Sequence, residues 1–211
     1  AVDASLEAYA RAVEAGCQML VVHHGIIWGG GLKPIVGRWY RHLKYLLDHG
    51  LNLYAAHLPL DMHPRAGNNA GLARMLGLRG LKQFGEYRGT LIGVEGVLAK
   101  KRTVEHIAAT LDRRLGGTST ILPFGKRENR RVGIVSGGGS DCLPEAAEKG
   151  IDCLVTGEPE HPNHHFAVEN HLNVVYCGHY HSEQVGVKAL GEVCVRRFGI
   201  WTMFLDMPTI V

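Results

Sequence analysis

The chain has 211 residues, of which 45% are hydrophobic and 20% are charged, with a formal net charge of +3 at pH 7. This composition excludes a disordered or fibrous protein, and so small a charge does not demand a polyanionic partner. No apolar run reaches the roughly 18 to 20 residues of a membrane span, and the five cysteines form no CxxC pair, so we expect a cytoplasmic protein with free thiols and no membrane partner.

Short apolar runs alternate along the chain with amphipathic stretches, which is the pattern of βαβ units. We therefore predict an α/β fold of mostly parallel sheet layers with helices on their faces. The first helix is capped by Asp3 or Ser5 and ends near Glu14. After it we predict a strand, a helix, a second strand and a shorter helix, at residues 18–22, 36–49, 51–56 and 69–76.

The pattern changes near residue 84. A glycine-punctuated, β-rich stretch at 80–100 precedes a predicted helix at 103–115 and a strand at 118–123. The remaining chain predicts strands at 131–136, 151–156, 172–177 and 201–205, and helices at 143–149, 163–170 and from the last histidines to about 196. We divide the chain into a first α/β half at 1–84, an inserted or linking β-rich lobe at 85–128, and a second α/β half at 129–211.

Residues able to bind a metal recur directly after predicted strands. In open parallel sheets, ligands bind beyond the carboxyl ends of the strands, where loops converge. The residues at this position are His23 and His24 after one strand, His57 and Asp61 after another, Glu158 and His161 after a third, and His179 and Glu183 after the last. Histidines with purely structural roles would not occur so often at one position, directly after a predicted strand.

Each of these motifs has a structural interpretation when it stands alone. A His-His pair on an extended segment is weak evidence for a metal, and its two rings point to opposite sides. Asp61, before Met-His-Pro, is more often a turn or cap residue. His179 and Glu183 are four residues apart, so a helix that begins near His179 presents both on one face.

Together, the five residues supply three imidazoles and two carboxylates. This set is sufficient for two ions bridged by a carboxylate, with positions left open for water. Because imidazole suits transition metals better than Mg or Ca, we expect two divalent ions per subunit, such as Zn, Fe, Mn or Ni.

Two further motifs each have two interpretations. The glycines of the GGGS sequence at 137–140 predict a tight turn from strand to helix, or else a nest of N–H groups for a phosphate. The basic stretch at 126–131 predicts a solvated connection, or else an anion-binding face.

Four longer motifs resemble the Nif-three-like dinuclear metal-centre proteins, the GTP cyclohydrolase type 2 homologue family. They are VVHHGIIW, YAAHLPLDMHPRAGNNAGLARMLGL, VTGEPEHPNHH and GHYHSEQVGVKAL, and the closing FLDMPT is also similar to the family's end. The resemblance implies two related α/β halves and a toroidal homohexamer whose metal sites face the interior. Family members usually open with a further strand and helix containing an Asn-Gly-Leu-Gln-like stretch, whereas this sequence begins at AVDAS.

The resemblance also implies roles for single residues. The motifs match metal ligands at His23, His24, Asp61, His179 and Glu183, with Asp61 as a bridging ligand. His57, Glu158 and His165 match positions near the metals. We expect His57 and Glu158 to transfer protons as catalytic residues, and His165 to support the ligands from outside.

The leading hypothesis is a dinuclear metal-dependent hydrolase of unknown substrate. The resemblance suggests a purine nucleotide, whose ring opening would need hydroxide attack on an electron-poor carbon. One alternative is a non-catalytic metal-binding ring protein that binds nucleic acid or a protein partner through basic clusters at 100–102 and 126–131. Another is a protein that stores or delivers metal.

Overall fold

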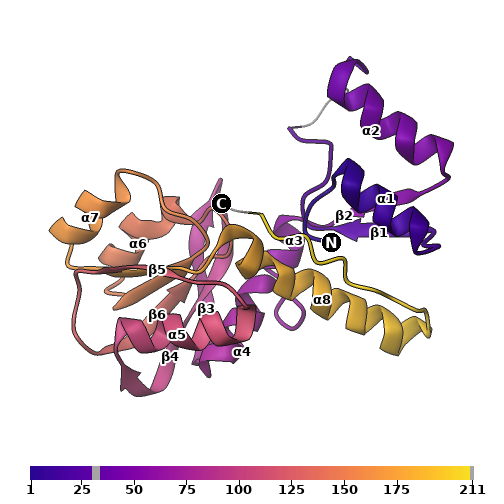
Figure 1. The fold of residues 1–211 in the computed structure, drawn as a ribbon. Helices are drawn as coiled ribbons and strands as arrows, with labels where there is room; N and C mark the ends of the chain where they lie inside the picture. Colours follow the sequence, from indigo (N-terminus) through magenta and orange to yellow (C-terminus); the bar gives the residue numbers. More distant parts are fainter. Residues whose placement is uncertain (30–33, 210–211) are drawn as a thin grey trace.

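Two sheets organise the structure, a computed structural model that describes residues 1–29 and 34–209 (Figure 1). The smaller sheet contains β1 (Met19–Val22) and β2 (Asn52–Ala55), which pair in parallel. Its helices are α1 (Leu6–Glu14) and α2 (Gly37–Asp48). The side chain of Ser5 caps α1 by accepting a hydrogen bond from the N–H of Ala8, so Ser5, and not Asp3, is the helix cap.

The larger sheet has six strands in the order β3-β4-β6-β7-β8-β5. Their bounds are Arg79–Tyr87, Thr90–Arg102, Asn129–Ile134, Cys153–Thr156, Asn173–Tyr176 and Thr120–Pro123, in that spatial order. The central strands β6, β7 and β8 are parallel, whereas β3, β4 and β5 are antiparallel to their neighbours. The prediction of an α/β fold is confirmed, but this sheet is mixed and not mostly parallel.

The antiparallel pairing of β3 with β4 has a local cause. Arg88 and Gly89 join β3 to β4 with φ angles of 51° and 79°. Two consecutive residues with positive φ make the tight turn whose twist matches a hairpin, and so short a connection can only join antiparallel strands. A parallel crossover would need a dozen or more residues.

Helices cover both faces of the larger sheet (Figure 1). On one face lie α4 (Asn68–Leu76), α5 (Val104–Leu115) and α8 (His179–Phe198), which share a buried apolar cluster with β6, β7 and β8. On the other face, α6 (Leu143–Glu148) and α7 (Asn163–Glu169) pack against the alternate residues of β7 and β8. Because successive side chains of a strand point to opposite faces, these strands need apolar residues throughout.

The end of the chain departs from the prediction. Residues 201–205 form no strand, although four of these five residues are large and apolar. The tail runs back along α8 instead, where Phe204 packs on the Lys188 side chain and the Tyr180 hydroxyl donates to Asp206 (Figure 1). Leu205 is buried, while Trp201 and Met203 stay exposed. An apolar sequence of this kind forms a strand only where a neighbouring strand is available for backbone hydrogen bonds.

The predicted β-rich lobe contributes to the larger sheet. Within residues 85–128, β4 pairs with β6 and β5 pairs with β8. The division of the chain at residues 84 and 128 stays a prediction. Across residues 1–29 and 34–209, no helix is both long enough and apolar enough to span a membrane.

Candidate metal centre

The predicted metal ligands come from three segments that the fold brings together. His23 and His24 follow β1, Asp61 ends the single helical turn α3 (Leu58–Asp61) after β2, and His179 and Glu183 lie in the first turns of α8 after β8. The sequence around Asp61 favours a turn or a cap, and the structure places Asp61 at the end of this short helix. The ends of both sheets thus meet at one site, as expected where strand ends carry the chemistry.

Glu183 lies at the middle of this site. Its Oε1 is 3.5 Å from Nε2 of His23, which is itself 3.3 Å from Oδ2 of Asp61. The other oxygen, Oε2, is 3.2 Å from Nε2 of His24 and 3.2 Å from Nε2 of His179. We call His23, Asp61 and Glu183 the inner group, and His24, His179 and Glu183 the outer group. Glu183 therefore spans the two groups, whereas the family resemblance suggested Asp61 as the bridge.

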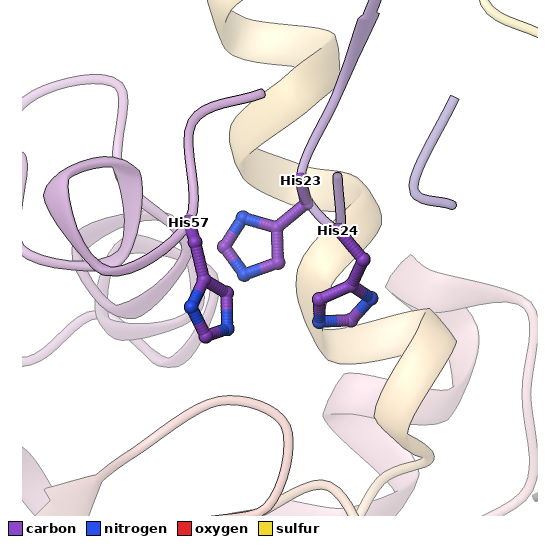
Figure 2. A group of neighbouring side chains, drawn as sticks. All are labelled: His23, His24 and His57. Carbon is purple, nitrogen blue, oxygen red and sulfur yellow. The ribbon is translucent and has the colours of Figure 1, made fainter. Parts of the chain in front are cut away.

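A third set of possible ligands includes His57. The ligand atoms of His23, His24 and His57 lie within 4.8 Å of one another, as they also do within the inner and the outer group. Figure 2 shows the three rings converging from the segments after β1 and β2, and the ring centroids of His23 and His57 are 4.9 Å apart. His57 is therefore placed to bind an ion as well as to transfer a proton.

Two buried atoms of the site have no hydrogen-bond partner among the described residues: Nε2 of His23 and Oε2 of Glu183. Leaving such atoms unsatisfied costs free energy, so each calls for an explanation. Ligands held at about 2.0 to 2.2 Å from one ion lie about 3.0 to 3.5 Å from each other. The distances of 3.2 to 3.5 Å around Glu183 fit this spacing, so the residues present fit divalent transition-metal ions.

The other ring nitrogen of each histidine contacts a different partner. Nδ1 of His24 lies 2.8 Å from Oδ1 of Asp3, and Nδ1 of His179 lies 2.8 Å from Oε2 of Glu158. Nδ1 of His23 lies 2.9 Å from the carbonyl oxygen of Ala56. With Nδ1 donating, each ring keeps a lone pair on Nε2, the atom that faces the carboxylates.

Neutral groups hold Asp61 in place. Its Oδ1 accepts hydrogen bonds from the side-chain amide of Asn68 at 2.8 Å and from the hydroxyl of Ser136 at 2.9 Å. Only Oδ2 is left to face His23. Asn68 also accepts a hydrogen bond from the backbone N–H of Gly186, so it ties Asp61 to α8.

Charge pairing controls protonation of the site. Burial lowers the pKa of His23, but the carboxylates of Asp61 and Glu183 raise it further, to about 10. The pKa of His179 rises to about 9 in the same way. Burial raises the pKa of Glu183, yet the adjacent imidazoles bring it down to about 2. In the absence of an ion, these raised pKa values favour the protonated forms of His23 and His179 beside the carboxylates. Burial, and then the charge of His23, lower the pKa of His57.

The glycine-rich turn after β6 is shaped by this site. A Cβ at Gly137 would collide with Oε1 of Glu183 and approach Nε2 of His179 to 3.1 Å. The N–H of Gly137 donates to the Ser182 hydroxyl, and that of Gly139 donates to the Thr156 hydroxyl. Because two of its N–H groups are already used within the fold, the turn matches the tight-turn interpretation and not the phosphate nest.

A cavity of about 460 Å³ opens beside the centre. His23 and His57 form its border with the candidate ligands, and Trp28, Leu53 and Tyr54 add apolar and aromatic walls. The rings of Trp28 and His57 meet edge to face, with centroids 4.9 Å apart. A planar ring would fit this environment next to the metal ligands.

The remaining predicted residues differ in position. Glu158 contacts the centre through His179. His165 is exposed on α7 with its ring against His164, and within the described chain no hydrogen bond or ion pair joins it to the centre, so its supporting role stays a prediction. The sequence analysis missed Asp3, Asn68 and Ser136. No spacing in the sequence predicts their contacts with the candidate ligands, because these contacts form only when the chain folds.

The fold and site together define an α/β protein that gathers candidate His, Asp and Glu metal-binding groups where its two sheets meet. The sequence model of the Duf34/NIF3 (NGG1p interacting factor 3) family matches residues 1–209. A protein of Archaeoglobus fulgidus named "GTP cyclohydrolase 1 type 2 homolog" is 46% identical over 209 residues, which cover 99% of this chain and 83% of that protein. The chain therefore belongs to the Duf34/NIF3 family.

Solved structures agree with this assignment. The protein ybgI, described as of unknown function, superposes with a TM-score of 0.91 at 33% identity, covering 100% of this chain and 83% of that one. The protein TTHA1606 of Thermus thermophilus gives a TM-score of 0.84 at 39% identity, with coverage of 100% and 83%. The family resemblance drawn from the sequence motifs is confirmed.

Proposed function

We propose that this protein is a metal-dependent hydrolase with a dinuclear centre. The inner group would hold one divalent ion and the outer group the other, with Glu183 shared. The observation that carries the proposal is that two buried atoms, Nε2 of His23 in the inner group and Oε2 of Glu183 in the outer group, have no hydrogen-bond partner among the described residues. An ion at each group would coordinate both atoms, which without an ion have only the long His–carboxylate contacts of 3.2 to 3.5 Å.

The residues around the centre have distinct tasks in this proposal. Divalent ions, when bound, would supply Lewis-acid activation of a water or substrate oxygen. His57 borders both the ligand groups and the cavity, so it can accept a proton from a group bound there. Glu158, half-exposed and paired with His179, can pass a proton between the centre and solvent.

The cavity supports a substrate that carries a planar ring. Trp28, Tyr54 and His57 offer ring faces and edges within one space that ends at His23. The relatives' name refers to a GTP cyclohydrolase, and a purine nucleotide is the substrate class we propose to test first. Such a base would place its ring carbons toward the ligand groups.

Metal content and turnover test the proposal together. The protein is purified without added metal, its ions are counted by elemental analysis, and it is then loaded with Zn, Mn or Fe and assayed against nucleotides and phosphate esters. We expect two ions per chain and turnover that is lost in Asp61→Ala. Asp48→Ala is the matched control, because Asp48 is exposed and pairs with Lys44 on the surface of α2. Unchanged turnover in Asp61→Ala refutes the hydrolase, and two ions without any turnover favour metal storage or a binding role.

We do not propose a nucleic-acid partner, because two of the basic side chains that could bind one already pair with carboxylates. Within the basic stretch at 126–131, Lys126 pairs with Asp152 at 2.8 Å and Arg131 pairs with Glu95 at 2.7 Å. A phosphate backbone would have to compete with these carboxylates. For the subunit partner we propose further copies of this chain, assembled as a hexamer. Phe198, Ile200 and Trp201, all at least half exposed at the end of α8, would lie in such contacts.

A further inference from the structure

We propose that Asp3 is a positioning residue of the outer group: its carboxylate fixes the His24 ring so that Nε2 faces Glu183. The inference rests on the proposed metal centre and assigns a part of it that no sequence motif marks. Its basis is the contact of 2.8 Å between Oδ1 of Asp3 and Nδ1 of His24.

The backbone holds Asp3 at this place. The carbonyl of Val2, just before Asp3, accepts the N–H of His24, and the N–H of Ala4, just after it, donates to the carbonyl of His24, both at 2.9 Å. Asp3 and His24 thus face each other across a parallel bridge. The side chain of Ser5, not that of Asp3, caps α1, so the Asp3 carboxylate is free for the imidazole.

This contact determines which nitrogen of His24 can bind an ion. A neutral imidazole carries one proton, and a carboxylate at Nδ1 keeps the proton there. The lone pair then sits on Nε2, which lies 3.2 Å from Oε2 of Glu183. The negative charge of the partner also makes the imidazole a stronger donor, and loss of such a partner usually weakens metal binding by about 10- to 100-fold.

The two groups differ in this respect. In the outer group both imidazoles have a carboxylate at Nδ1, namely Asp3 for His24 and Glu158 for His179. In the inner group the imidazole of His23 has only the carbonyl of Ala56. Removal of the Asp3 carboxylate should therefore weaken one of two ions and leave the other in place.

The experiment is a Co²⁺ titration of the metal-free full chain, followed by absorption spectroscopy, in wild type, Asp3→Asn and Asp3→Ala. We expect two ions in wild type. One of them should bind about 10-fold more weakly in Asp3→Asn and up to about 100-fold more weakly in Asp3→Ala, with a changed absorption band for that ion only. Glu7→Gln is the control, since Glu7 is exposed nearby and pairs with Arg11.

The outcomes separate the two proposals. Wild type that binds no Co²⁺ refutes the metal centre itself. Wild type that binds two ions, with both affinities and both bands unchanged in the Asp3 variants, overturns only the role of Asp3. Thermal unfolding of each metal-free variant checks the fold. If Asp3→Ala does not fold, Asp3→Asn decides by the same criterion, because it preserves the size of the side chain.

Discussion

The inner and outer groups share Glu183 but differ in exposure and in the partners of their ligands. The side chains of His23 and Asp61 are 0% and 7% exposed, and neutral groups hold them. Those of His24 and His179 are 19% and 26% exposed, and carboxylates hold them. A buried ligand is fixed by the packing around it, whereas a ligand near solvent needs a dedicated partner to keep its orientation. The inner group thus depends on the core, and the outer group on Asp3 and Glu158.

Glu183→Gln should have the largest effect, because Glu183 belongs to both groups. Replacing one of its oxygens with an amide removes the shared charge, so we expect both ions to bind more than about 100-fold more weakly, with loss of any turnover. Elemental analysis after dialysis measures this. Glu192→Gln on the exposed part of α8, where Glu192 pairs with Arg196, should retain both ions. If one ion stays bound in Glu183→Gln, the residue is not shared.

Gly137→Ala should disturb both groups through the fold. Its Cβ would collide with Glu183, and its φ is +64°. Gly150 has the same φ of +64° but nothing within 4 Å of an added Cβ. We expect Gly150→Ala to cost about 1 to 2 kcal/mol from the backbone alone, and Gly137→Ala to cost about 1 to 3 kcal/mol more. Urea unfolding of the metal-free proteins measures both. Equal losses of unfolding free energy in the two variants would show that the turn has room for a Cβ beside Glu183.

Proton release on metal binding should distinguish the site from a static salt-bridge cluster. In the metal-free protein the pKa values of His23 and His179 are raised to about 10 and about 9, so both rings are protonated at pH 7. A metal must displace these protons, and its affinity should rise up to about tenfold per pH unit for each proton released. Calorimetry between pH 6.5 and 8.5, in buffers of different ionisation enthalpy, measures the release.

The raised pKa values of His23 and His179 also predict how the stability of the metal-free protein changes with pH. A raised folded-state pKa contributes stability that is fully present below the unfolded value, near 6.5, and is lost as the pH rises through about 9 to 10. The free energy of unfolding should therefore decrease above neutral pH unless other groups offset it. An affinity for metal that does not change with pH would contradict the assignment of these two histidines as ligands.

Ser136→Ala should have the smallest effect and should act on the inner group alone. It removes one of two hydrogen bonds to Oδ1 of Asp61, and Asn68 keeps the other. We expect about a 10-fold weaker inner ion and an unchanged outer ion in a Co²⁺ titration. Thr110→Ala removes an exposed hydroxyl that bonds within α5 and should change neither. Weaker binding of the outer ion in Ser136→Ala would show that the two groups do not bind their ions independently.

The α/β class and most of the helices and strands could be predicted from the sequence, and so could the candidate ligands, but not their supporting residues Asp3, Asn68 and Ser136. His23 and His24 follow a short apolar run, and the four-residue spacing of His179 and Glu183 gives one face of a helix. These are local signals, since side-chain period and strand ends are properties of short segments. The resemblance in four motifs added the family, which the comparison over residues 1–209 confirms.

The arrangement of those residues depends on contacts that no local pattern carries. β4 and β5 pair as antiparallel strands with β6 and β8 of the larger sheet, and the apolar tail at 201–205 pairs with no strand. The contact between Asp3 and His24 joins residues 21 apart, and that between Ser136 and Asp61 joins residues 75 apart. Such contacts form only when segments distant in the sequence pack together. The residues adjacent in the chain therefore do not indicate which partner a side chain will contact.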